Sequence, residues 1–205
     1  MKYLCIGDIH QNYKPYLEII NECDKVGLKT IQLGDLGFDY SPLNHINHEN
    51  HKFIMGNHDN YGNIPGNCLG DYGIYDDIFY IRGGFSIDAK YRTMGYDLFW
   101  NEELGRQDRE DCLALYKKLK PKYVISHEAP RSIIHNFTNS DFLRNFGFNP
   151  KTFTTNTSEL LERCFKEHQP KEWLFAHFHR SWDAEINGTK FRLLNCYEPY
   201  ILTTD

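Results

Sequence analysis

Five short apolar segments of the chain each run directly into aspartate, asparagine or histidine residues. The segments are Lys2–Ile6, Thr30–Leu33, Lys52–Met55, Tyr123–Ser126 and Trp173–Ala176. They lead, in that order, into Gly-Asp-x-His, Gly-Asp, Gly-Asn-His-Asp, His and His-x-His. Short apolar runs of this kind are typical of buried strands, and ligand sites in α/β sheets lie at the carboxyl ends of strands. We therefore expect these polar side chains to converge on one rim of a sheet.

The segments between these strands favour an α/β fold. An apolar stripe from Tyr16 to Cys23 predicts a helix that closes near Gly27. Arg109–Leu119 and Ser158–His168 predict two later helices, the second with Ser158 as its cap. The expected strand–helix alternation is typical of α/β domains.

The remaining segments add a hairpin and a loop-rich region but no domain boundary. Asn187-Gly188 is a type I′ turn signal between 183–186 and 190–194, and residues 60–101 are expected to form loops around short strands. The 205 residues contain no repeat and no low-complexity linker, so we expect one domain over 1–205.

Seven residues at the strand ends are candidate metal ligands. They are Asp8, His10, Asp35, Asn57, His127, His177 and His179. Taken alone, an H-x-H pair is more often a polar strand end, and a Gly-Asp pair is usually a turn or a helix cap. Members of a pair two residues apart can face the same side of an extended segment. Together, at five successive strand ends, they indicate a single site.

The mixture of oxygen and imidazole donors indicates which ions the site would hold. It suits Mn²⁺, Fe or Zn²⁺ and is poor for the all-oxygen coordination of Ca²⁺. Seven ligands are too many for one tetrahedral zinc, so two ions that share a carboxylate, about 3.5–4 Å apart, are expected. We expect manganese, with iron, zinc, nickel or cobalt as alternatives.

The ordered motifs resemble those of the calcineurin-like metallophosphoesterase superfamily, and they extend over nearly the whole chain. The resemblance implies a four-layer αββα sandwich of the metallo-dependent phosphatase type, with a dinuclear site at one edge. It implies that one metal is held by Asp8, His10 and His179, that the other is held by Asn57, His127 and His177, and that Asp35 bridges the two.

The same resemblance implies hydrolysis of phosphoric esters by direct attack of a metal-bridging hydroxide. His58 matches the outer histidine that stabilises the transition state or protonates the leaving oxygen. The Asp-Arg pair of some relatives is missing after Asp35: Asp39 stands one place late, and Asp59 is the alternative partner for His58. Arg92 is then the favoured phosphate-binding residue, with an ion pair to Asp88 as its alternative role.

Two further arginines are candidates for binding phosphate, and a second set of motifs carries a further resemblance. Arg131 and Arg180 are lesser candidates for binding phosphate. The segments Arg82–Asp88 and Ser126–Pro130 resemble those of uncharacterised bacterial and phage phosphoesterases. This second resemblance assigns no substrate.

The sequence leaves the substrate open. A phosphomonoester or a phosphodiester would fit, carried by a phosphorylated small molecule, a nucleotide or a phosphoprotein. The net charge of −5 speaks against duplex DNA, which needs a basic track. There are two alternatives to an enzyme. One is a non-catalytic, metal-bound sensor of phosphate or nucleotide, and the other is a scaffold subunit.

From the composition and the segment lengths we expect a cytoplasmic protein. The apolar stretches are too short for a membrane span, and Asp8 interrupts the N-terminal segment before a signal peptide could form. The six cysteines are far apart and contain no C-x-x-C pair, so they are expected to be free thiols with no catalytic role.

Overall fold

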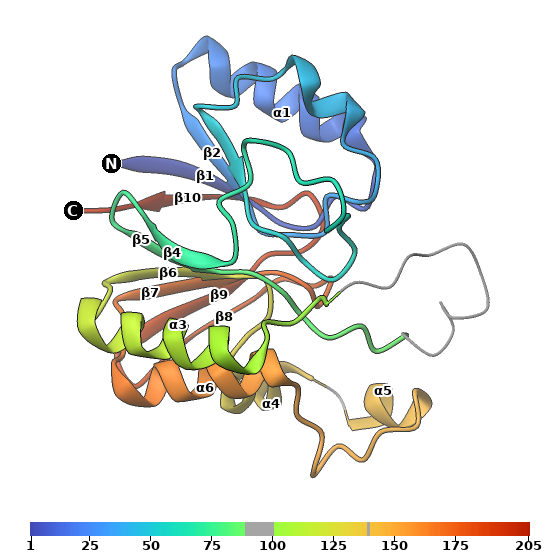
Figure 1. Cartoon of the computed structure of the whole chain (residues 1–205), viewed down its shortest axis with the longest axis vertical. Helices are drawn as coiled ribbons and strands as arrows, with labels where there is room; N and C mark the ends of the chain where they lie inside the picture. Colours follow the sequence, from blue (N-terminus) through green and yellow to red (C-terminus); the bar gives the residue numbers. More distant parts are fainter. Residues whose placement is uncertain (89–100, 139) are drawn as a thin grey trace.

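Two β-sheets lie face to face, and helices cover the outer face of each sheet (Figure 1). The computed structural model that shows this arrangement describes residues 1–88, 101–138 and 140–205. The four layers are the αββα sandwich that the family resemblance implied. Arg92 lies outside the described residues.

The first sheet has the strand order β10-β1-β2-β3. Its strands are β1 (Lys2–Ile6), β2 (Lys29–Gln32), β3 (His51–Phe53) and β10 (Pro199–Thr203). The first three run parallel, and β10 pairs antiparallel with β1. Helix α1 (Tyr13–Lys25) covers the outer face, and the short 3₁₀ helix η1 (Ser41–His45) precedes β3.

The second sheet has the order β4-β5-β6-β7-β9-β8. Its strands are β4 (Tyr72–Tyr75), β5 (Ile78–Ile81), β6 (Tyr123–Ser126), β7 (Glu172–Phe175), β8 (Trp182–Ile186) and β9 (Thr189–Leu193). Strands β5, β6, β7 and β9 run parallel, whereas β4 and β8 are antiparallel edge strands.

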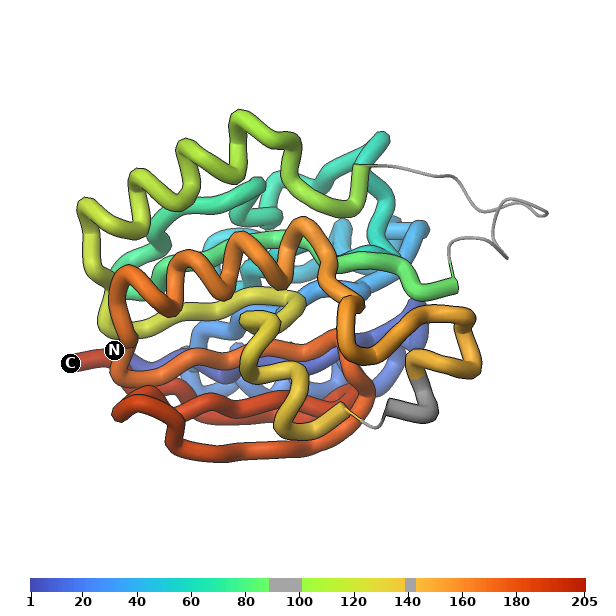
Figure 2. Tube along the Cα trace, turned by 90° about the horizontal axis from the view of Figure 1, so that it is seen from below, coloured from blue at the N-terminus to red at the C-terminus, as the bar shows by residue number. Residues whose placement is uncertain are grey.

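Helices form the outermost layer beneath the second sheet. They are α3 (Arg106–Leu119), α4 (Arg131–Phe137) and α6 (Asn156–Glu167), with the short α5 (Ser140–Asn145) after α4. Figure 2 shows α3 and α6 side by side across this face. None of the helices in the described part of the chain has both the length and the apolar character needed to span a bilayer.

Alternation along the central strands explains why the second sheet is covered on both faces. In β6, Tyr123 and Ile125 enter the core between the sheets, whereas Val124 joins the core under the helices. In β7, Leu174 faces the other sheet and Trp173 faces the helices. A strand buried on both faces must be apolar throughout, which is why these segments are short continuous apolar runs.

The start of α6 differs from its prediction. The helix begins at Asn156, with Thr155 as its cap, and Ser158 occupies the third helical position. Thr155 Oγ1 accepts from Ser158 N at 2.9 Å, and Ser158 Oγ accepts from Thr155 N at 3.0 Å. The prediction of Ser158 as the cap was therefore wrong. In a capping box, the cap residue and the third helical residue each bond through the side chain to the other's backbone N–H, so the sequence alone does not tell which of two hydroxyl residues is the cap.

Candidate metal centre

All seven predicted ligands lie at the carboxyl ends of strands and meet at one rim. Asp8 and His10 follow β1, Asp35 follows β2 and Asn57 follows β3. The others follow two strands of the second sheet: His127 comes directly after β6, and His177 and His179 come shortly after β7. The rim is therefore built by both sheets, and the opposite edge holds the chain ends, where Met1 N donates to Thr204 O at 2.8 Å.

One group of donor atoms gathers around Asp8. Ligand atoms of Asp8, His10, His179 and Cys196 all lie within 4.8 Å of one another. His179 Nε2 is 3.1 Å from Asp8 Oδ2 and 2.8 Å from His10 Nε2. Asp8 is buried, whereas His179 is exposed, so this group is open to solvent on one side.

A second group gathers around His127. Ligand atoms of Asp35, His127 and His177 also lie within 4.8 Å of one another. His127 Nε2 is 3.3 Å from Asp35 Oδ1, 3.2 Å from His177 Nδ1 and 3.0 Å from Asn57 Oδ1. Asn57 Nδ2 donates to Ser86 Oγ at 3.0 Å, which turns the amide oxygen toward His127.

Asp35 lies between the two groups. Its Oδ1 faces His127, and its Oδ2 is 3.9 Å from His10 Nε2 in the first group. Within the described part of the chain, Asp35 Oδ2 is buried and has no hydrogen-bond partner, whereas Asp8 Oδ2 lies 3.1 Å from His179 Nε2 and 3.6 Å from His10 Nε2. A buried carboxylate oxygen without a donor requires an explanation, and a bound cation supplies one. The residues present therefore fit two divalent ions.

Electrostatics at the rim keep both carboxylates ionised. Burial alone would raise the pKa of Asp35, but the neighbouring charge and hydrogen bond of His127 hold it well below its usual range. Burial likewise opposes ionisation of Asp8, whose pKa is lowered by His10 and His179. Burial would lower the pKa of His127, yet Asp35 and Asp8 raise it to about 10. The two ionised carboxylates thus stabilise positive charge beside them.

Glycines precede three of the motifs because candidate ligand side chains or a neighbouring loop pack directly on them. A Cβ at Gly56 would collide with the Asp35 carboxylate and with His127 Nε2. A Cβ at Gly34 would collide with the His127 ring, and one at Gly7 would collide with Asn195 O. Any larger residue at these positions would displace a ligand or the loop beside it.

Several ligands occupy strained backbone. Asp35, His177 and His179 have φ values of 60°, 73° and 49°, in the left-handed region that L residues seldom adopt. Such conformations persist only where the surrounding structure enforces them, and they cluster at functional sites. Here the hydrogen bonds of the loops enforce them.

Asp59 organises these loops. Its Oδ2 accepts from the backbone N–H of Asp35 and Gly56 at 2.8 and 2.7 Å. Its Oδ1 accepts from Gly37 N at 3.0 Å and from Tyr40 Oη at 3.2 Å. Burial and the charge of Asp35 raise the pKa of Asp59 to about 6. These bonds make Asp59 a positioning residue for the Asp35 and Asn57 loops, a role that the sequence did not indicate.

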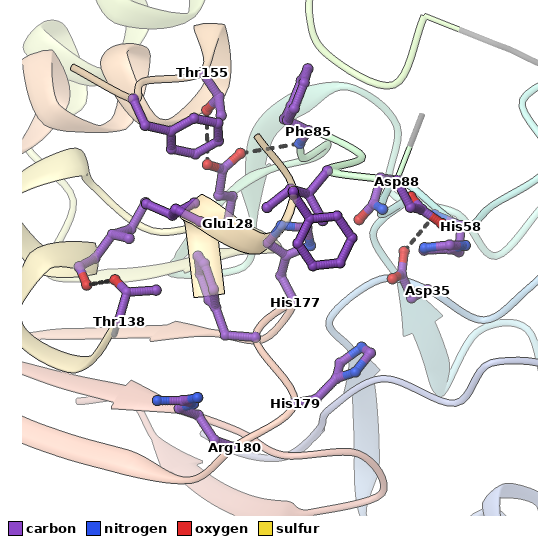
Figure 3. A pocket seen from close by; sticks show the side chains of 17 residues that line it. Asp35, His58, Phe85, Asp88, Glu128, Thr138, Thr155, His177, His179 and Arg180 are labelled. Atoms are coloured by element: carbon purple, nitrogen blue, oxygen red, sulfur yellow. Dashed lines mark hydrogen bonds between the residues drawn. The ribbon is translucent and has the colours of Figure 1, made fainter. Parts of the chain in front are cut away.

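His58 lies beside the ligands at the mouth of a cavity of about 460 Å³ (Figure 3). Its backbone N–H donates to Asp35 Oδ1 at 2.7 Å, and its ring centroid is 5.3 Å from that of His10. Of the lesser arginine candidates, Arg180 lines the cavity, whereas Arg131 Nε lies 3.7 Å from Glu159. Arg180 is therefore the better placed of the two.

Cys196 is the member of the first group that the sequence did not predict as a ligand. It follows β9 in the same way that the other ligands follow their strands. The Asn187-Gly188 signal indicated a hairpin but not the parallel pairing of β9 with β7, which brings the end of β9 to the same rim. Applying the strand-end rule to the 190–194 segment would have found this residue.

Comparison with known proteins gives one family. The family model named Metallophos, described as calcineurin-like phosphoesterase, matches residues 1–196. The search of curated proteins found no match.

Comparison with solved structures lists two matches of low score. One is titled "GAP50 the anchor in the inner membrane complex of Plasmodium"; the match has a TM-score of 0.49 and 9% identity, and covers 95% of this chain and 71% of that one. The other is a hypothetical protein from Thermus thermophilus, with a TM-score of 0.44, 13% identity and coverage of 95% and 75%. Both scores are too low to support an argument about function.

Replacing Gly56 with alanine tests how tightly the rim is packed. Because the new methyl group would collide with Asp35 and His127, we expect the free energy of unfolding to fall by about 1–3 kcal/mol, the usual cost of overpacking. Urea unfolding in EDTA measures this. Gly66→Ala is the matched control, since a Cβ there meets nothing within 4 Å. Equal stability of the two variants would contradict the packing described.

Proposed function

Because the chain belongs to the calcineurin-like phosphoesterase family, we propose that it hydrolyses phosphoric esters with two divalent ions held at this rim. One ion is held by Asp8, His10 and His179, the other by Asn57, His127 and His177, and Asp35 is shared. The observation that carries the proposal is the place of Asp35, a buried carboxylate whose two oxygens face both groups.

Two divalent ions bound there supply Lewis acidity, since they lower the pKa of water and offset the charge of a phosphoryl group. The chain's own residues supply the rest. His58, half-buried and anchored to Asp35 through its backbone, presents an imidazole that can pass a proton to the leaving oxygen. Asp59 holds the loop that carries His58. Arg180 provides a cation at the cavity, and Arg92 stays a proposed phosphate-binding residue.

The substrate in this proposal is a phosphomonoester or phosphodiester of a small molecule, a nucleotide or a phosphoprotein, and the protein acts in the cytoplasm. The net charge of −5 again disfavours duplex DNA. Manganese is the proposed ion for the second group, whose donors are nitrogen and oxygen only.

The first group includes a thiol, and we extend its ligand set to Cys196. Tyr197 N donates to Asp8 O at 3.0 Å, and Tyr197 Oη donates to Ile9 O at 2.7 Å. These two bonds hold the Cys196 loop against the loop of Asp8, and they bring the Cys196 thiol within 4.8 Å of the Asp8 carboxylate. A soft sulfur ligand shifts this site toward zinc, iron or cobalt.

Hydrolysis of p-nitrophenyl phosphate and bis-p-nitrophenyl phosphate tests the proposed activity. With added Mn²⁺ we expect turnover of at least one compound, and its loss in EDTA. His58→Ala should lower the rate by about 10²–10⁴-fold, the usual contribution of a proton donor. His45→Ala, an exposed histidine away from the rim, is the control. No turnover with Mn²⁺, Fe²⁺, Co²⁺, Ni²⁺ or Zn²⁺ would contradict the proposal and favour a non-catalytic sensor or a scaffold subunit.

Metal content tests the shared position of Asp35. Asp35→Asn should reduce bound metal at both groups, because its carboxylate faces both, whereas His10→Ala should reduce it at one. Metal per chain is measured by mass spectrometry after dialysis. Asp39→Asn, in an exposed turn where Asp39 accepts from Ser41, serves as the control. Equal losses in the Asp35 and His10 variants would rule out a bridge.

Cobalt absorption tests the thiol ligand without relying on activity. The Co²⁺-loaded protein should show a sulfur-to-cobalt charge-transfer band in the near ultraviolet, and Cys196→Ser should abolish it. Cys68→Ser, which changes another half-buried thiol that belongs to neither group of donor atoms, should keep the band. Identical spectra of the wild type and Cys196→Ser would exclude Cys196 from the ligand set.

A further inference from the structure

The cavity beside the metal centre has two chemically different ends. Figure 3 shows Asp35, His58 and His179 toward one side, and Glu128 and Thr155 toward the other. The cavity is also lined by apolar side chains, namely Phe85, Ile87, Leu143, Phe146, Phe153 and Phe178. Its volume of about 460 Å³ is within the range of pockets that hold small organic ligands.

The aromatic side chains that form the wall of the cavity have apolar surface available for contact with a ligand. Phe85, Phe146, Phe153 and Phe178 are only half-buried, so each leaves apolar surface facing the cavity. Phe85 and Phe153 also pack edge-to-face, with centroids 6.0 Å apart, and both contact Phe148 at 5.9 and 4.9 Å. These contacts keep the rings in place, and covering their exposed surface with another apolar group is favourable.

The polar groups on the same wall bond to the protein itself. Glu128 Oε2 accepts from Phe85 N at 3.3 Å, and Glu128 Oε1 accepts from Thr155 Oγ1 at 2.8 Å. Thr138 Oγ1 donates to the backbone carbonyl of Ile134. Glu128 therefore ties the Phe85 loop to the start of α6 and shapes the wall, while the rings make most of the surface that a ligand would meet.

We propose that this cavity receives the organic part of the phosphoester, and that this part carries an aromatic ring. The inference rests on the proposed function, because the phosphoryl group must lie at the rim, where His177, His179 and Arg180 also line the cavity. A sugar or polyol phosphate would press its hydroxyl groups against phenylalanine rings and lose their hydrogen bonds to water. A ring meets the same wall by stacking or edge contact.

Such a ring could come from a nucleobase or from an aryl ester. Calorimetric titration of the Mn²⁺-loaded protein with three phosphonates, which cannot be hydrolysed, separates these sources. The ligands are ethylphosphonate, benzylphosphonate and the phosphonate analogue of adenosine 5′-monophosphate. We expect at least one ring-bearing ligand to bind about tenfold or more tightly than ethylphosphonate, as is usual for base–aromatic stacking. If only the adenosine compound binds more tightly, the ring of the substrate is a nucleobase. If only the benzyl compound binds more tightly, the ring belongs to an aryl ester.

Variants connect that preference to the wall. Phe153→Leu and Phe85→Leu keep the wall apolar but remove one ring each, and we expect each to reduce the preference for the ring-bearing ligand by several-fold. Phe191→Leu, in the core under the helices and outside the cavity, should keep the preference. Thermal unfolding of each variant checks that it is folded.

Three results would overturn the inference, and they are distinguishable. Equal affinity for all three phosphonates, with p-nitrophenyl ester hydrolysis intact, would remove the aromatic subsite and leave the proposed function standing. Failure of every phosphonate to bind, together with an absence of hydrolysis, would overturn both. A ring preference that survives in both Phe153→Leu and Phe85→Leu but is lost in Phe191→Leu would place the ring elsewhere.

Discussion

Two buried negative charges, Asp8 and Asp35, dominate the rim on which the candidate site is built. Removing a carboxylate from water is costly unless hydrogen bonds or opposite charges replace the water. Here imidazoles surround each carboxylate, yet Asp35 Oδ2 has no hydrogen-bond partner among the described residues. The loops around these carboxylates bring positively charged groups close to them. This close approach explains why glycines precede three of the motifs, why several candidate ligands have left-handed backbone, and why Asp59 bonds to the backbone of the loops.

This arrangement is possible because the carboxyl ends of the parallel strands lie at the same rim of the two sheets. Each strand contributes a loop of a few residues, and Asp59 joins the loops after β2 and β3 through four hydrogen bonds. The second sheet contributes His127 and His177 from neighbouring strands. No single loop could hold all these side chains, so the site is a property of the two-sheet stack rather than of any one motif.

The convergence of the seven candidate ligands on one rim could be predicted from the sequence, because each of them follows an apolar strand and parallel strands end at the same edge of a sheet. Cys196 and the wall around Phe85 and Phe153 depend instead on tertiary neighbours. Cys196 reaches the rim only because β9 pairs in parallel with β7. Phe153 lies in irregular chain before α6, where no periodicity indicates which way a side chain points. Phe85 follows β5 in a loop and lines the cavity.

The antiparallel pairing of β10 with β1 has a consequence for how the chain is made. Lys2 is paired with Thr203 and Ile6 with Pro199, so the strand that precedes Asp8 gains its second neighbour only from residues 199–203. During synthesis one edge of β1 stays unpaired until these residues have left the ribosome. Contacts between residues so distant in sequence slow folding and leave a strand edge open to wrong partners in the meantime.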